Sequence, residues 1–241
     1  MGEGGQILAG EHNPGGASGI RVPKQQRSQE TQETILAAAL AIFSDHGYRG
    51  ASTHEIAERA QVAQPLLMYH FPTKADLWLA VAQLAIDAFL ERFRPRFEAL
   101  EGLDPASKVR IVFQDYVRFA AERPELHKLM IDASVSGEPN LAGLVETRLR
   151  PVFELLREEI VAAQKAGTML PGDPVLLYYS LVGVAATVFS LRREVELLAG
   201  QDPREPETVE AQANLLAQLF FPAPRADQQT ENKSDDYGRL T

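Results

Sequence analysis

STHEIAERAQVAQPLLMYHFPTKAD, residues 52–76, predicts two short helices joined by a tight turn, with a third helix beginning directly behind them. Two pairs of residues in it have the spacing of a capping box, in which a hydroxyl binds the amide three residues on and a carboxylate binds back. These pairs are Ser52 with Glu55 and Thr73 with Asp76. The order of the helix starts is that of a helix-turn-helix.

The apolar residues of this segment recur at helical spacing, which gives each short helix one face to bury. The residues that form the buried contact are Ile56, Ala57, Ala60, Val62, Leu67 and Phe71. The other positions of the second helix, Gln64, Met68, Tyr69 and His70, are then expected to point outward.

A longer helix is predicted before this segment, from about Ser28 to His46, with Gly47 as the left-handed residue that ends it. This helix, the Gly47-Tyr48 pair and the run from Tyr69 to Lys74 follow in the order of the tetracycline-repressor (TetR) family, and the segment resembles its DNA-binding domain. The resemblance implies an all-helical homodimer. Its small N-terminal domain would read double-stranded operator DNA, and its larger C-terminal domain would dimerise and bind a small-molecule effector.

The resemblance also indicates which residues face DNA. The DNA-binding candidates are Ser52, Thr53, Ala63, Gln64, Pro65, Leu66, Tyr69, His70 and Lys74. Gln64 is the best candidate for reading a base, because its amide can pair bidentately with adenine. Tyr69 and His70 carry donors suited to phosphate oxygens, and Thr53 and Lys74 lie in first turns of helices, where free amides also meet phosphates.

Three positions depart from the family pattern at the turn. Gln61 stands where a glycine is usual, and a left-handed conformation there costs about 1 kcal/mol relative to glycine. Ala63 cannot cap the second helix, whereas Pro65 in its first turn restores rigidity without losing a helical hydrogen bond. The operator sequence therefore cannot be carried over from a relative.

Composition fits a globular protein. The 241 residues are 45% hydrophobic and contain no cysteine, which excludes disulfides and thiolate metal sites and favours a cytoplasmic location. The net charge of −9 argues against a nucleic-acid partner, but between Arg21 and Lys74 six basic residues stand against five acidic ones. An acidic body with a near-neutral head would repel DNA everywhere except at the reading surface.

The rest of the chain is predicted to be helical, and we expect an all-α protein in four parts. These are a disordered leader (1–27), the helix-turn-helix domain (28–73), an effector-binding and dimerisation domain (74–222) and a disordered tail (223–241). The helix that starts at Lys74 should kink or break at Pro95. Prolines that favour the first turn of a helix predict further helix starts at Pro105, Pro124, Pro139 and Pro174.

The longest apolar run, 175–191, carries no charge, yet it falls short of the roughly 20 apolar residues of a membrane span. A helix of this kind in a globular protein needs burial on every side, and a subunit interface supplies one side. By resemblance, this helix and an amphipathic one at 209–221 pair with their symmetry mates as a four-helix bundle. The alternative is that both complete the core of the monomer.

The effector site gives the weakest signal in the sequence. The candidate lining residues are Tyr116, His127, Met130, Phe153, Tyr178 and Phe189, because small-molecule sites are mostly apolar with a few polar groups. Each of them is also an ordinary core residue by type.

An enzyme is disfavoured. His54-Glu55-Ile56-Ala57-Glu58 lacks the second histidine of a zinc-protease helix, and no phosphate loop or nucleophile elbow is present. We therefore expect no catalysis, no cofactor, no metal and no membrane contact. The sequence predicts a ligand-responsive transcriptional regulator, a repressor in the first instance, that binds a palindromic operator as a homodimer. The alternative is a helical ligand- or partner-binding module that has lost DNA recognition.

Overall fold

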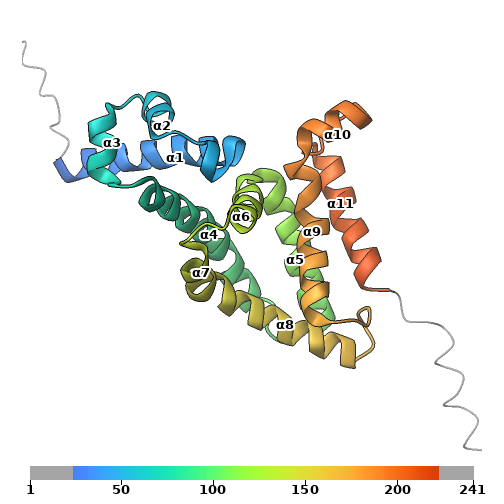
Figure 1. Ribbon diagram of the computed structural model, residues 1–241. Helices are drawn as coiled ribbons and strands as arrows, with labels where there is room; N and C mark the ends of the chain where they lie inside the picture. Colours follow the sequence, from blue (N-terminus) through green and yellow to red (C-terminus); the bar gives the residue numbers. More distant parts are fainter. Residues whose placement is uncertain (1–23, 223–241) are drawn as a thin grey trace, which may run out of the picture.

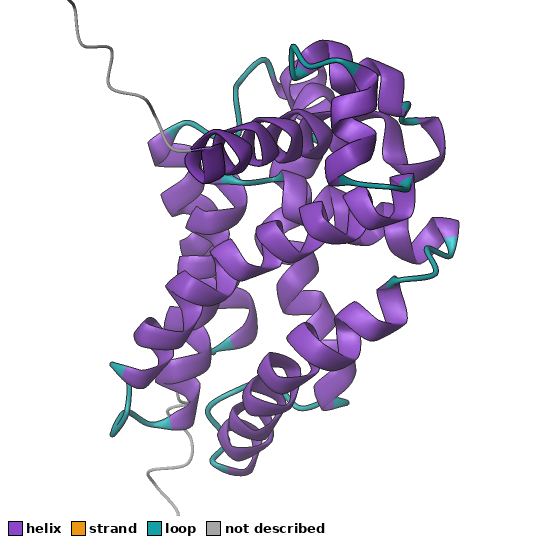
Figure 2. Cartoon of the chain, turned by 90° about the vertical axis from the view of Figure 1, so that its left-hand side faces the viewer, coloured by secondary structure: helices purple, strands orange, loops and turns teal. Residues whose placement is uncertain are grey.

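The computed structural model describes residues 24–222, and this part of the chain is helical throughout, with turns between the helices and no strand (Figure 2). The predicted all-α class is correct. The expected leader and tail lie outside the described residues, apart from positions 24–27. Those four belong to helix α1 (Lys24–Gly50), so the first helix begins earlier than Ser28. The reason is that they are good helix formers, and the carbonyl of Arg27 accepts a hydrogen bond from the Thr31 hydroxyl at 2.8 Å.

The first three helices form a small head at one end of the molecule (Figure 1). α1 lies across α2 (Thr53–Arg59) and α3 (Gln64–His70). The predicted apolar contact is present, since Ile56, Ala57, Ala60, Leu67 and Phe71 are all buried. Gly47 interrupts α1 with φ 69° and ψ 172°, so the predicted positive φ is correct although ψ is extended.

One long helix, α4 (Lys74–Glu98), connects the head with the rest of the molecule (Figure 1). It begins at the predicted capping box, in which the Thr73 hydroxyl accepts from the Asp76 amide and the Asp76 carboxylate accepts from the Thr73 amide. It does not end at Pro95, which lies inside the helix three residues before its end. A proline removes only one helical hydrogen bond, and that loss is small in a last turn.

The remaining helices make the larger body. They are α5 (Pro105–Glu122), α6 (Glu125–Ser136), α7 (Leu141–Leu144), the π-helical turn η1 (Val145–Leu149), α8 (Arg150–Lys165), α9 (Pro174–Ser190), α10 (Arg192–Ala199) and α11 (Pro206–Phe220). α5 is central, since α8, α9 and α11 all pack against it. Pro105 and Pro174 stand at helix starts capped by Asp104 and Asp173, as predicted. Pro139 does not, because α7 starts two residues later.

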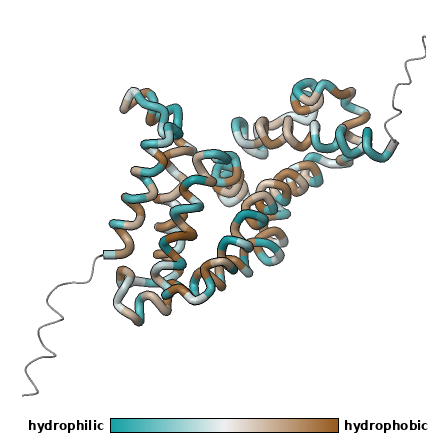
Figure 3. Tube along the Cα trace, turned by 180° about the vertical axis from the view of Figure 1, so that it is seen from behind, coloured by the Kyte–Doolittle hydropathy of each residue, from teal (hydrophilic) through white to brown (hydrophobic). Residues whose placement is uncertain are grey.

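α9 and α11 lie side by side and leave apolar residues uncovered. Leu176 and Tyr179 of α9 and Leu215 and Leu219 of α11 are exposed. α9 is therefore not buried on every side within one chain. Figure 3 shows hydrophobic and hydrophilic segments alternating along the body helices, as expected for helices with one apolar face. No single helix among residues 24–222 is long and apolar enough to cross a membrane; α9 and α10 pass that test only as a pair, bent by 69°.

Candidate nucleic-acid interface and ligand pocket

The start of α2 is capped, but in a different way from the prediction. The Ser52 hydroxyl accepts from the His54 amide at 3.2 Å rather than from the third amide of the helix. Glu55 does not bind back to Ser52; its carboxylate lies 3.6 Å from His46 Nδ1 on α1. The capping box predicted at this position was therefore half right, because a partner on a neighbouring helix competes for the carboxylate.

The turn between α2 and α3 holds the predicted strain. Gln61 has φ 56°, the one positive φ at a non-glycine residue in the range 24–222. Ala63 stands at the N-cap of α3 and gives no side-chain hydrogen bond, while Pro65 lies in the first turn. The backbone still closes the turn, since the Val62 amide donates to the Ala57 carbonyl at 3.0 Å.

One face of α3 is presented to solvent. Only Leu67 of this helix is buried, and the side chain of Tyr69 is 80% exposed. Its ring meets the His70 ring edge to face, with 5.4 Å between centroids. The exposed predicted DNA contacts on and before α3 are Ala63, Gln64, Pro65, Leu66 and Tyr69, and His70 is half-buried. These positions form a continuous surface of amide, phenol and small apolar groups, which we call the α3 face.

Lys74 lies beside this surface at the start of α4. Its Nζ is 4.9 Å from the centre of the Tyr48 ring and 3.4 Å from the Arg49 carbonyl oxygen. Burial lowers the pKa of Lys74, and the carboxylate of Glu138 acts against that shift. The ammonium is thus held at the edge of the head. Ser52 and Thr53, at the start of α2, are exposed and half-buried respectively.

The head is joined to the body by a polar contact between the end of α1 and α6. The Tyr48 amide donates to Asp132 Oδ2 at 2.7 Å, and Arg49 Nη2 donates to the Ser136 carbonyl at 3.0 Å. A Cβ atom on Gly47 would lie 2.5 Å from Asp132 Oδ1. Glycine is therefore required here both by its positive φ and by the close approach of the carboxylate.

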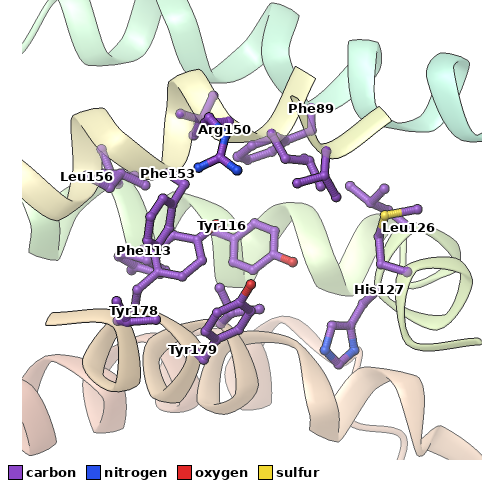
Figure 4. A pocket seen from close by; sticks show the side chains of 17 residues that line it. Phe89, Phe113, Tyr116, Leu126, His127, Arg150, Phe153, Leu156, Tyr178 and Tyr179 are labelled. Carbon is purple, nitrogen blue, oxygen red and sulfur yellow. The ribbon is translucent and has the colours of Figure 1, made fainter. Parts of the chain in front are cut away.

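A cavity of about 320 Å³ lies inside the body (Figure 4). Residues from α4, α5, α6, η1, α8 and α9 line it. The lining consists of Phe89, Val112, Phe113, Tyr116, Leu126, His127, Met130, Val145, Leu149, Arg150, Val152, Phe153, Leu156, Val175, Tyr178, Tyr179 and Val182. This is the size and character of a small-molecule site.

Five of the six predicted effector residues line this cavity: Tyr116, His127, Met130, Phe153 and Tyr178. Phe189 does not; it is 1% exposed and belongs to the core, since it lies on another turn of α9. Sequence reasoning missed Arg150 and Tyr179, which also line the cavity. No pattern in the sequence marks either residue, because they meet only when α8 and α9 pack against α5.

Burial disfavours the charged forms of three polar groups of the cavity, Tyr116, Tyr178 and His127. Burial raises the pKa of Tyr116 far above its ordinary value and that of Tyr178 to about 12. It lowers the pKa of His127, whose Nδ1 lies 2.8 Å from the Ser190 hydroxyl. Figure 4 shows the hydroxyls of Tyr116 and Tyr179 turned toward one another across the cavity. No group of three or more His, Asp or Glu side chains able to hold a metal ion occurs within residues 24–222.

Comparisons with known proteins agree with this architecture. Residues 35–81 match the family model described as bacterial regulatory proteins, tetR family. The chain is 29% identical over 170 residues to the HTH-type transcriptional activator FasR of Mycolicibacterium smegmatis, covering 68% of this chain and 75% of that protein. It is 27% identical over 178 residues to the HTH-type transcriptional regulator RutR of Escherichia coli, covering 72% of this chain and 81% of that protein.

A solved structure has the same fold over most of the chain. The crystal structure of AibR in complex with isovaleryl coenzyme A and operator DNA has a TM-score of 0.64 and 20% sequence identity, covering 80% of this chain and 100% of that one. This likeness shows a common fold. Together with the family match in the head and the two relatives, it leads to one conclusion. The head carries the match to the tetR family of bacterial regulatory proteins, and over more than two thirds of its length the chain is similar to HTH-type transcriptional regulators.

Proposed function

We propose that the protein is a ligand-responsive transcriptional repressor that binds a palindromic operator as a homodimer. The observation that carries this proposal is the α3 face, on which Gln64 and Tyr69 are exposed although the helix itself is anchored by buried Leu67. A rigid helix with an exposed amide and phenol can enter a major groove, where glutamine pairs with adenine and tyrosine reaches a phosphate. The proposed contacts are the nine DNA-binding residues predicted from the sequence.

The proposal divides the chain between Thr73 and Lys74, with a DNA-reading head before this point and a body for ligand and partner behind it. Lys74 supports a role at phosphates, because its ammonium lies at the edge of the head, over the Tyr48 ring, and makes one long hydrogen bond to a carbonyl. Thr53 lies at the first position of α2, where free amides and the helix dipole favour an anion.

A homodimer is supported by the uncovered apolar residues of α9 and α11. Leu176, Leu215 and Leu219 are exposed in one chain, and Gly183 has no atom within 4 Å of the position of a Cβ. Small residues permit a close approach of helices, and a second copy of the same two helices would cover these leucines. A two-fold dimer would set two α3 helices about 34–36 Å apart, which requires a palindromic site.

Ligand response is supported by the position of α6. Leu126, His127 and Met130 in its first half line the cavity, and Asp132 in its second half binds the Tyr48 amide of the head. A ligand that changes the position of α6 must change DNA affinity, and DNA must change ligand affinity by the same factor. AibR, which has this fold, was solved with both operator DNA and a ligand. We further propose that the protein acts in the cytoplasm and catalyses no reaction.

The test is selection of random duplex DNA on the purified full chain, at low and then at rising salt, with sequencing of the retained molecules. A palindromic motif with two half-sites about one helical turn apart is expected. Gln64→Ala is the paired variant, and it should relax preference at one position per half-site, costing about 1–3 kcal/mol there. Equal losses on all sequences would exclude direct readout by Gln64.

Absence of any enriched sequence at low salt would overturn the proposal in favour of a helical ligand- or partner-binding module. The sign of regulation needs a second assay, since FasR is named as an activator. A reporter behind the selected operator should be silenced by the protein and released in the presence of ligand. Stronger expression with the protein present would make it an activator.

A further inference from the structure

We propose that the cavity takes a small apolar carboxylic acid, with its hydrocarbon body against the aromatic walls and its carboxylate between Arg150 and the hydroxyls of Tyr116 and Tyr179. The inference rests on the proposed function, because it names the ligand class of that pocket. It follows from three properties of the lining: the shape of its apolar part, the kind of polar groups it offers, and the charges it lacks.

The walls of the cavity are aromatic and packed. Phe153 meets Tyr178 edge to face at 5.0 Å between ring centroids, and Phe113 meets the same ring at 6.2 Å. On the opposite side Phe89 lies 5.5 Å from Tyr116. Most of the other lining residues are valine, leucine and methionine. A body of hydrocarbon therefore gains the free energy of leaving water, while a polar body would lose its hydration without replacement.

The polar groups that face the cavity are hydrogen-bond donors. Tyr116 is partly buried and Tyr179 is 64% exposed, and the hydroxyls of both face the cavity with no hydrogen-bond partner among the described residues. Because burial raises the pKa of Tyr116, its hydroxyl keeps the proton and can donate it to a ligand oxygen. Two convergent hydroxyl donors favour an acceptor oxygen on the ligand.

Arg150 makes the site favour a ligand oxygen that carries negative charge. Figure 4 shows its guanidinium directed toward the space between Phe89 and Phe153. Its Nε donates to Glu146 at 2.6 Å, its Nη2 donates to the second oxygen of the same carboxylate, and Glu154 lies 4.0 Å away. All three side chains are partly exposed, so water screens these ion pairs. A ligand carboxylate can take over the guanidinium in its bidentate geometry at little cost.

Negative charge is absent from the lining. No Asp or Glu is among the 17 residues around the cavity, and His127 is neutral at physiological pH because burial lowers its pKa. Arg150 is therefore the one charged group at this site. Within the lining, a cationic ligand would meet a like charge and no carboxylate, whereas an anion that displaces Glu146 would meet a guanidinium and two donors.

The backbone around Arg150 is unusual in a way that fits a binding site. α7, η1 and α8 form a continuous helix from Leu141 to Lys165, and η1 is its π-helical turn. Val145 and Leu149 of this turn and Arg150 directly after it all line the cavity. π-helical turns are rare and occur frequently at functional sites, since the extra residue redirects the side chains that follow.

The test is a charge series on one hydrocarbon body. Octanoic acid, its methyl ester and octylamine are titrated into the full-length protein by calorimetry, together with 4-phenylbutyric acid as an aromatic body. Either acid is expected to bind at least about tenfold more tightly than the ester and the amine, and to raise the melting temperature most. Weaker binding of both acids than of the ester, or equal binding of all probes, would overturn the proposal, as would no binding at all.

Three variants locate the preference. Arg150→Gln should remove the advantage of acid over ester while leaving ester binding unchanged, and Tyr116→Phe should weaken the acid several-fold with the ring shape retained. Arg157→Gln is the control, because Arg157 also lies on α8 and pairs with Glu154 but does not line the cavity. An unchanged acid preference in both Arg150→Gln and Tyr116→Phe would exclude the proposed orientation.

This experiment separates the inference from the proposed function. Operator binding is measured without ligand, so a protein that binds an operator but prefers the ester or the amine refutes the acid and keeps the regulator. A protein that prefers the acid but binds no operator supports the ligand class and refutes the DNA-reading role.

Discussion

The head and the ligand cavity are built in opposite ways. In the head, the residues that fix α2 and α3 lie within about one turn of each helix in sequence, as at Ser52, Gln61 and Thr73. The cavity is lined by residues from Phe89 to Val182 on six helical segments, and no two neighbouring helices complete it. A locally built site is stable in one form, whereas a site shared among helices changes when any of them moves. We therefore expect the proposed reading surface to keep one form and the proposed ligand site to adjust when a helix moves.

The contact between the two regions should be the most sensitive point. Gly47→Ala introduces a Cβ 2.5 Å from Asp132 Oδ1 at a residue with φ 69° and ψ 172°, a conformation that is almost confined to glycine. We expect it to lower the free energy of unfolding by about 3 kcal/mol, measured by urea denaturation. DNA affinity should fall as well, because the Tyr48 amide loses its position on Asp132.

Gly137→Ala is the matched control, since Gly137 has φ 70° and no atom within 4 Å of the new Cβ. It should cost about 1–2 kcal/mol through the backbone alone. Equal losses in the two variants would mean that the approach of Asp132 to Gly47 adds nothing to the cost of the substitution.

The head itself can be probed at Lys74. Lys74→Ala should weaken binding to all DNA sequences alike and reduce the magnitude of the salt slope by about one unit, because one phosphate contact is lost. The measurement is fluorescence anisotropy over a range of salt concentrations, with Lys165→Ala, at an exposed position of α8, as the control. A slope equal to that of the control would remove Lys74 from the interface and leave it as a partner of the Tyr48 ring.

At the uncapped start of α3, a substitution should raise the stability of the protein instead of lowering it. Ala63→Ser places a hydroxyl at an N-cap that now has no side-chain hydrogen bond, and this should stabilise the protein by about 1 kcal/mol. Ser52→Ala should cost a similar amount, because it removes the bond to the His54 amide. Both changes are read from thermal unfolding. If the head and the cavity are built independently, neither substitution should alter ligand affinity. A changed ligand affinity would show that the stability of the head affects the cavity.

The smallest effect concerns the cavity and pH. Burial holds the pKa of His127 below its ordinary value of 6.5, so the folded state binds fewer protons than the unfolded state. The stability contribution is therefore complete above about pH 6.5 and is lost as pH falls toward the folded pKa. His127→Gln should flatten the decrease in stability between pH 6.5 and 5, while His54→Gln, at an exposed histidine, should leave it in place. An unchanged decrease in His127→Gln would assign it to other groups.

The same contrast explains how far the sequence could be read. Thr73 with Asp76, Asp104 with Pro105, and Gly47 were predictable because a cap or a positive φ depends on neighbours in the chain. The predicted bond from Glu55 back to Ser52 was wrong, because the partner of Glu55, His46, is on another helix. In the body, apolar spacing predicts helices but not which faces meet, so Phe189 was assigned to the cavity while Arg150 and Tyr179 were missed. Only the packing of α8 and α9 on α5 distinguishes them.

The twelve residues of α6 have a consequence for genetics. Their first half touches the cavity through His127 and Met130, and their second half touches the head through Asp132 and Ser136. Substitutions along this single helix should therefore fall into two allele classes in a reporter screen. Substitutions in the first half would leave repression intact and abolish induction by the ligand. Substitutions in the second half would weaken repression and leave ligand binding intact. The boundary between the classes should lie within one turn, between Met130 and Asp132.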